Sequence, residues 1–113
     1  PSSILLGLMA SGFNGQNFAF SGYLPIEPQA RKRRLRQITE RIRNERQTQI
    51  FIETPYRNNR LIAELAATLP GEFSLCVACE LTAPSQEVRL MTLSKWRNAS
   101  YDFSKRPAIF LLS

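Results

Sequence analysis

Apolar residues recur one helical turn apart in three segments of the chain, which predicts three helices. The first should be short and well buried, the second is charged outside one narrow apolar stripe, and the third follows a Thr-Pro pair suited to a helix start. These helices are expected at residues 3–10, 29–46 and 55–69. Leu35, Ile38 and Ile42 form the stripe of the second helix.

Five shorter apolar segments, bounded by Gly, Pro and polar residues, predict strands. They lie at residues 18–24, 47–53, 73–79, 87–93 and 108–112. Ile50, Phe51 and Ile52 are consecutive, which is typical of a strand covered on both faces. The order predicts an α/β fold with a mixed five-stranded sheet flanked by helices. Early strands joined by helical crossovers should run parallel, and late strands joined by short links can run antiparallel.

The length of 113 residues suits a single domain. No apolar run approaches the length of a membrane span, and residues 1–12 lack the positively charged start of a secretory signal. We therefore expect a cytoplasmic domain without a membrane segment. Because the chain starts at Pro1 and stops directly after its last predicted strand, we also expect it to be one piece of a longer protein.

Cys76 and Cys79 have the spacing of a redox or zinc CxxC pair. They lie within a predicted strand, however, where side chains three positions apart point to opposite faces. The sequence has no His and no second cysteine pair. We interpret the two thiols as buried core residues and expect no metal site.

The net charge of +6 is concentrated in one helix. Residues 31–46 hold eight of the fifteen Lys and Arg residues but only Glu40 and Glu45 as acids, so this segment accounts for the whole excess. Such a helix can be a solvated surface element with ion pairs along it, for example Arg41 with Glu45. Five cations within the first six positions favour a contact with a polyanion, through phosphate neutralisation. They are Arg31, Lys32, Arg33, Arg34 and Arg36.

Two predicted strands end on a carboxylate, Glu53 and Glu80. Ligands of α/β sheets bind beyond the carboxyl ends of parallel strands, so these residues are candidates for a binding site. A carboxylate ahead of a helix is also favoured by the helix dipole without any ligand, and both interpretations stay open. The chain carries no Gly-rich phosphate loop, no nucleophile–base pair and no metal-binding motif, so these residues alone indicate no reaction.

Several segments together resemble a known superfamily. They are, in order, "FAFSGYLP", the basic helix, "TQIFIETPYR" and "ACELT" followed by Glu87. This series resembles the carboxyl-terminal half of the tetrapyrrole methylases, and most closely the branch that methylates the 2′-oxygen of a cytidine in small-subunit ribosomal RNA. The first residues, "PSSILLGLMASG", resemble the helix that leads into the second domain of these enzymes.

The resemblance implies that residues 1–113 are the C-terminal domain of a two-domain enzyme whose N-terminal domain is absent from this chain. Such enzymes hold S-adenosylmethionine between their halves, so this half alone should be inactive, whereas the full-length protein should be a homodimeric RNA methyltransferase. The resemblance places Ser2, Ser3, Glu53, Leu81 and Thr82 at the cofactor. It places Glu80, Tyr56 and Arg57 at the substrate edge of the site.

The chain departs from this branch beside the Glu-Leu-Thr motif, where Cys79 and Ala83 replace an Arg and a Lys. This departure leaves a tetrapyrrole of the uroporphyrinogen or precorrin type open as the methyl acceptor. A third alternative is a non-enzymatic nucleic-acid-binding domain that uses only the basic helix. A pure binder would have no use for Glu53 and Glu80 at an edge that phosphate avoids.

Overall fold

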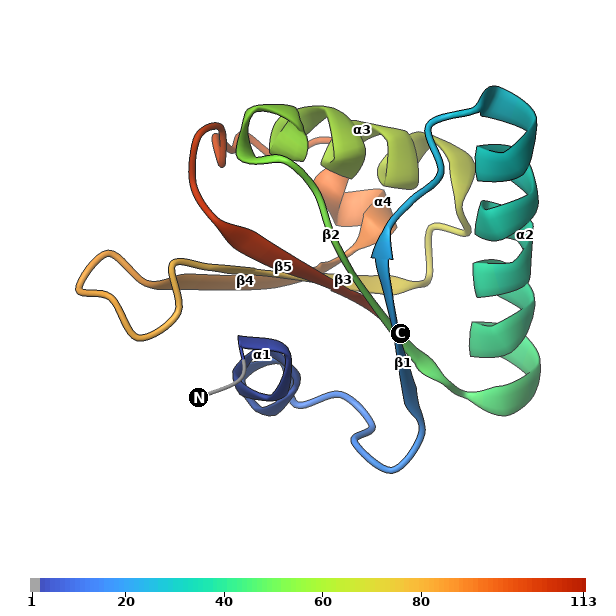
Figure 1. Cartoon of the computed structure of the whole chain (residues 1–113), viewed down its shortest axis with the longest axis horizontal. Helices are drawn as coiled ribbons and strands as arrows, with labels where there is room; N and C mark the ends of the chain where they lie inside the picture. The colour runs from blue at the N-terminus through green and yellow to red at the C-terminus, as the bar shows by residue number, and fades with distance from the viewer. Residues whose placement is uncertain (1–2) are drawn as a thin grey trace.

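The computed structural model describes residues 3–113 and shows a five-stranded sheet with helices on both faces (Figure 1). In chain order the elements are α1 (Ser3–Ser11), β1 (Phe18–Tyr23), α2 (Pro28–Glu45), β2 (Thr48–Ile52), the 3₁₀ turn η1 (Pro55–Arg57), α3 (Asn58–Thr68), β3 (Ser74–Cys79), β4 (Glu87–Thr92), α4 (Leu93–Trp96) and β5 (Ala108–Leu112). The predicted α/β class is confirmed. The helix expected at residues 55–69 begins as the turn η1 and continues as α3, and α4 is an addition to the predicted elements.

The sheet is mixed, with the strand order β1-β2-β5-β3-β4. β1 and β2 are parallel, as their helical crossover predicted, and β4 is antiparallel to β3. β2 and β3 do not pair, because β5 lies between them and runs antiparallel to both. They therefore run in the same direction, and both finish at one edge of the sheet, which we call the carboxyl edge.

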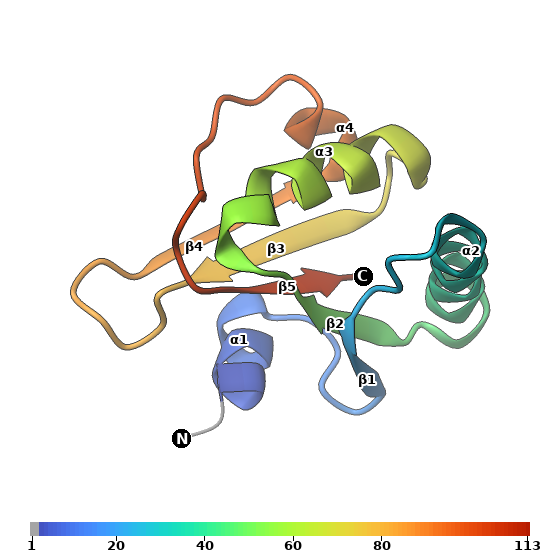
Figure 2. The ribbon, with the colours of Figure 1, turned by 45° about the horizontal axis from the view of Figure 1, so that its top comes forward.

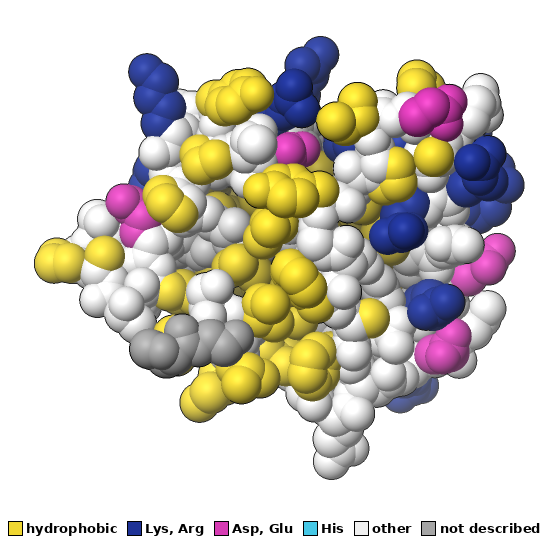
Figure 3. All heavy atoms as spheres, in the orientation of Figure 1, with side chains coloured by type: hydrophobic (Ala, Val, Ile, Leu, Met, Phe, Trp, Pro, Cys, Tyr) yellow, Lys and Arg dark blue, Asp and Glu magenta, His cyan; other side chains and the backbone are white. Residues whose placement is uncertain are grey.

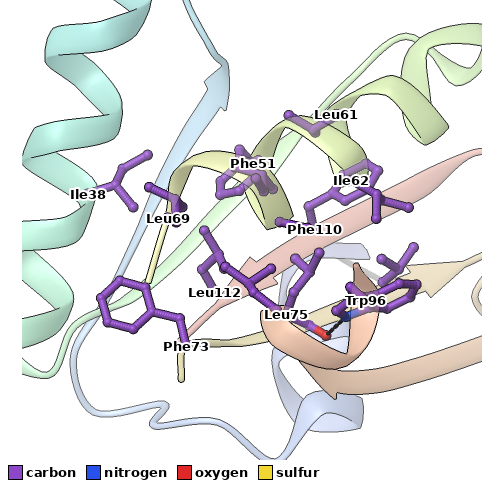
Figure 4. Packing of buried hydrophobic residues seen from close by; sticks show 14 of the residues in the cluster. Ile38, Phe51, Leu61, Ile62, Leu69, Phe73, Leu75, Trp96, Phe110 and Leu112 are labelled. Carbon is purple, nitrogen blue, oxygen red and sulfur yellow. Dashed lines mark hydrogen bonds between the residues drawn. The ribbon is translucent and has the colours of Figure 1, made fainter. Parts of the chain in front are cut away.

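Helix α1 lies on one face of the sheet, and α3 and α4 lie on the other (Figure 2). The larger core forms on the α3 side, where the apolar stripe of α2 also packs, so the predicted burial of that stripe is confirmed. Phe51 and Phe110 stack in this core at 6.2 Å between ring centroids (Figure 4). Helix α2 begins at Pro28, and the Glu27 carboxylate accepts hydrogen bonds from the first free N–H groups of the helix.

The expectation that the first helix is well buried is wrong. Only Gly7, Leu8 and Ser11 of α1 are buried, whereas Leu5 and Met9 are 53% and 78% exposed. One short helix covers only part of its sheet face, since apolar side chains of β1 and β4 stay exposed on the same face. These are Phe18, Phe20, Tyr23, Val88 and Leu90. Figure 3 shows apolar side chains gathered in a band over the middle of this side of the molecule.

The two cysteines are buried and unbonded, as predicted. Cys76 packs in the α1-side core and Cys79 in the opposite core, because an odd spacing along β3 sends their side chains through opposite faces. Burial raises the pKa of the Cys76 thiol to about 11, so it is protonated at neutral pH. This pair can neither chelate a metal nor close a disulfide within β3.

Candidate functional site

An apolar hollow of about 390 Å³ opens at the carboxyl edge on the α1 side of the sheet. It is lined by Ser3, Ala78, Glu80, Leu81, Ala83, Pro107, Ala108 and Ile109. Short alanine side chains at the ends of β3 and β5 leave the space, and Leu81 closes one wall. The Ser3 hydroxyl and the Glu80 carboxylate supply polar atoms to a largely apolar lining. Small-molecule sites are usually built this way, with apolar walls and a few polar groups.

A second, charged hollow of about 490 Å³ lies at the same edge but next to α2 and α3. Its lining comprises Ile26, Arg31, Glu53, Arg57, Arg60, Leu61 and Glu64. Leu61 belongs to the α3-side core, whereas Ala78 and Ile109 of the apolar hollow belong to the α1-side core. The two predicted carboxylates, Glu53 and Glu80, thus share one edge of the sheet but line different hollows.

Glu53 has a local partner in the next residue. One oxygen of its carboxylate accepts a hydrogen bond from the Thr54 backbone N–H at 2.8 Å. Thr54 is the N-cap residue of η1 and makes no side-chain cap hydrogen bond. The Glu53 contact is therefore local to the strand end and leaves both interpretations of this carboxylate open.

Tyr56 and Arg57 follow at the charged hollow. The Tyr56 ring is 67% exposed, and the guanidinium carbon of Arg57 lies 5.4 Å from its centroid. Arg60, one turn further along α3, is exposed and lines the same hollow. An exposed aromatic face beside two guanidinium groups is suited to stacked bases and phosphates.

Loop 80–86 forms the outer wall of the apolar hollow. Glu80 and Thr82 have φ values of +50° and +70°, in the left-handed region that side chains rarely adopt. The Thr82 N–H donates to the Gln86 side chain at 2.8 Å, and Leu81 faces the hollow. Of the predicted cofactor residues, Ser3 and Leu81 line this hollow together with the edge residue Glu80, whereas Ser2 lies outside the described residues.

The structure adds Arg106, which sequence reasoning missed. Its Nε donates to Glu80 at 2.7 Å, its Nη1 to Glu87 at 2.8 Å and its Nη2 to the Ser85 carbonyl at 2.9 Å. These bonds raise the pKa of the guanidinium, with Glu87 as the largest cause and Glu80 the next. Arg106 precedes β5, and only the insertion of β5 beside β3 brings it to Glu80.

The predicted polyanion-binding residues divide into two groups. Arg31 is occupied by the protein itself, since its Nε and Nη2 bind Glu64 at 2.8 and 2.5 Å and its Nη1 donates to the Pro25 carbonyl. These contacts raise the pKa of Arg31, mainly through the hydrogen bond with Glu64. Lys32, Arg33 and Arg36 are exposed. Arg34 is half-buried near β1, so it is less accessible than they are.

The predicted ion pair between Arg41 and Glu45 is present, at 3.8 Å. Within residues 3–113, no three His, Cys, Asp or Glu side chains come together as a metal site. None of the helices in this range is both long and apolar enough to cross a membrane.

No protein-family model matches the chain, but curated relatives do. It is 33% identical over 95 residues to the ribosomal RNA small subunit methyltransferase I of Vibrio cholerae, covering 84% of this chain and 32% of that protein. It is 34% identical over 93 residues to the protein of the same name from Mesorhizobium japonicum, covering 82% of this chain and 30% of the relative. The chain thus spans about a third of the length of these relatives.

A solved structure shares the fold. The crystal structure of the methyltransferase CobJ superposes with a TM-score of 0.65, covering 99% of this chain and 47% of that chain. The two are 15% identical in sequence, so this match concerns the fold alone.

Proposed function

Because the chain belongs to the family of the ribosomal RNA small subunit methyltransferase I proteins, within the tetrapyrrole methylase superfamily, we propose that it is the C-terminal half of an S-adenosylmethionine-dependent RNA methyltransferase. The proposed reaction is 2′-O-methylation of a cytidine in small-subunit ribosomal RNA. One observation carries the proposal: three of the residues that the resemblance assigned to the cofactor or the substrate edge, one near the start of the chain and two adjacent residues far from it in sequence, line one apolar hollow. They are Ser3, Glu80 and Leu81.

The lining of the apolar hollow fits the nucleoside end of S-adenosylmethionine. Leu81, Pro107 and Ile109 offer apolar walls to a planar base, and the Ser3 hydroxyl is available to a polar edge or a ribose. The cofactor, when bound, supplies an electrophilic methyl group on a sulfonium. The remaining task of the protein is to align donor and acceptor away from water, which requires neither a nucleophile nor a metal from this chain. Thr82 is not among the residues that line the hollow, and it would shape the wall only through the backbone conformation of the loop.

RNA would reach this edge from the opposite face of the sheet. Lys32 and Arg36 line a groove between α2 and α3 that adjoins the charged hollow through the Arg31–Glu64 pair. Beyond that pair, Arg60, Arg57 and Tyr56 lead along the carboxyl edge. This row of cations with one exposed ring is suited to phosphate contacts along α2 and to base stacking at the carboxyl edge.

The rest of the proposed enzyme has a place to pack. The exposed apolar band over α1, β1 and β4 is large for a free surface, and the relatives are about three times as long as this chain. We assign the band to contacts with the missing N-terminal domain and with a second copy in a homodimer. A ribosomal substrate would place the enzyme in the cytoplasm.

The alternative acceptor is a tetrapyrrole, which the fold shared with CobJ allows. The basic groove favours RNA, because an acceptor of small size would not need cations on a helix away from the hollow. A domain that only binds nucleic acid would not explain why Ser3, Glu80 and Leu81, all assigned to the cofactor or the substrate edge, line one apolar hollow.

Methyl transfer tests the proposal directly. The full-length protein should transfer labelled methyl from S-adenosylmethionine to undermethylated small ribosomal subunits, with the label on a cytidine 2′-oxygen. Glu80→Gln and Glu53→Gln should each lower this rate by about tenfold or more if their charges serve the reaction. Glu72→Gln, which removes an exposed charge far from the edge, is the matched control. If wild type labels only a tetrapyrrole, the acceptor is misassigned; if both edge variants keep the parent rate, capping alone explains the carboxylates.

The salt dependence of RNA binding tests the helix. Replacing Lys32, Arg33 and Arg36 with Gln should leave the fold intact, because exposed charges contribute little to stability. Each lost phosphate contact should reduce the slope of log K against log salt by roughly 0.7–0.9. Arg31→Gln is the control. It should destabilise the protein, because it leaves the Glu64 carboxylate without its partner, but it should leave the slope unchanged, because Arg31 is already occupied by Glu64. An unchanged slope in the triple variant would mean that these three cations make no phosphate contacts and serve only as a solubilising surface.

A further inference from the structure

We propose that Arg106 is a positioning residue that holds loop 80–86 as the wall of the apolar hollow and thereby sets the affinity for the nucleoside end of the cofactor. The inference rests on the proposed function for the identity of the ligand. The clamp itself is visible in the contacts of this chain. Arg106 therefore acts through the loop, without being one of the residues that line the hollow.

The loop needs an external restraint. Two of its residues have positive φ, and Thr82 is β-branched, for which this conformation is unusually strained. Left-handed backbone is unfavourable at each residue with a side chain, because Cβ comes too close to the following carbonyl oxygen. The loop is internally held by two backbone turns, from Ala83 N–H to the Glu80 carbonyl and from Gln86 N–H to the Ala83 carbonyl, and by the bond from Thr82 N–H to the exposed Gln86 side chain. Such a segment should relax unless another part of the protein holds it.

Arg106 provides that restraint at both ends of the loop. It binds Glu80, where the loop leaves β3, and Glu87, where β4 begins, and it also binds the Ser85 carbonyl between them. The side chains of Arg106 and Glu80 are 26% and 27% exposed, so this ion pair is partly shielded from water. Hydrogen bonds between charged groups are stronger than neutral ones. One guanidinium thus fixes the span of the loop across the hollow.

Arg106 is itself held by the start of α3. The buried side chain of Asn58 donates from Nδ2 to the Arg106 carbonyl at 2.7 Å and to the Phe103 carbonyl at 3.0 Å. Asn59 accepts from the Phe103 N–H at 2.8 Å, and the Lys105 N–H donates to the Pro55 carbonyl. The segment after β2 is therefore connected through Arg106 to the loop after β3. This connection explains why two asparagines follow the Tyr-Arg pair.

Hydrogen exchange on the 113-residue chain tests the clamp without any ligand. In Arg106→Gln, the Ala83 and Gln86 amides should exchange about tenfold faster, because their turn opens more often. Arg43→Gln is a matched control. Like Arg106, which lies over the Phe103 ring, Arg43 combines an ion pair, with Glu72, and a ring contact, with Phe73. Its loop amides should exchange as in wild type. Unchanged protection of the loop in Arg106→Gln, with the variant folded, would overturn the clamp.

Ligand binding to the full-length protein tests the consequence. Arg106→Gln should weaken S-adenosylhomocysteine about tenfold and raise KM for S-adenosylmethionine similarly, with KM for RNA and kcat nearly unchanged. Arg106→Lys should recover part of the affinity, since it keeps the charge but loses the forked geometry. Faster loop exchange with unchanged nucleoside affinity would overturn the positioning role. Failure of the wild type itself to bind S-adenosylhomocysteine would instead refute the proposed function, while the exchange result would still stand on its own.

Discussion

The isolated 113-residue chain is expected to bind S-adenosylmethionine at least about 100-fold more weakly than the full-length enzyme does. Tight small-molecule sites enclose most of the ligand surface, and in the proposed arrangement the apolar hollow would contact one end of the cofactor from one side. A loss of 100-fold corresponds to about 2.7 kcal/mol, which is modest for half of a ligand's contacts.

Titration calorimetry on both proteins, side by side, measures this difference. The Arg106→Gln variant of the full-length enzyme serves as a reference for damage confined to the hollow of this half. Micromolar affinity of the isolated chain would contradict the view that the cofactor site is shared with another domain.

Replacing Trp96 with Ala is expected to lower the free energy of unfolding by about 3–5 kcal/mol. The indole is 1% exposed, packs edge-on against Tyr101 at 5.4 Å between centroids, and donates from Nε1 to the Leu75 carbonyl at 3.0 Å (Figure 4). The change therefore leaves a large cavity and removes the indole hydrogen bond to the buried Leu75 carbonyl. Urea denaturation followed by circular dichroism gives the difference.

Two further variants serve as comparisons for this loss of stability: one keeps the ring packing but not the hydrogen bond, and the other removes an exposed ring. Trp96→Phe keeps much of the ring packing but removes the indole hydrogen bond to the Leu75 carbonyl, which should cost about 0.5–1.5 kcal/mol. Tyr56→Ala removes an exposed ring and should cost less than about 0.5 kcal/mol. If Trp96→Ala were no more harmful than Tyr56→Ala, helix α4 would not be part of the core.

Sequence periodicity determined the elements well because it records which faces are buried. The stripe of α2, the two-sided burial of β2 and the opposite faces of Cys76 and Cys79 all follow from the repeat of helix or strand, and the structure bears each out. Helix α4 was missed because four residues are too few to show a period. The burial of α1 was overestimated, since a pattern marks apolar residues but does not say whether this chain covers them.

The sequence proposed candidate site residues but not their arrangement. Motif resemblance brought Ser3, Glu80 and Leu81 forward, and they do line one hollow. Whether Glu53 joined them depended on the strand order, and the insertion of β5 between β2 and β3 separated the two carboxylates.

The same insertion decided the role of Arg106. Nothing local distinguishes an arginine ahead of the last strand, because its partners Glu80 and Glu87 lie 26 and 19 positions away. Periodicity along a chain reports burial, which is a local property of each element. Contacts between distant residues depend instead on which strands become neighbours, and packing of the whole sheet decides that.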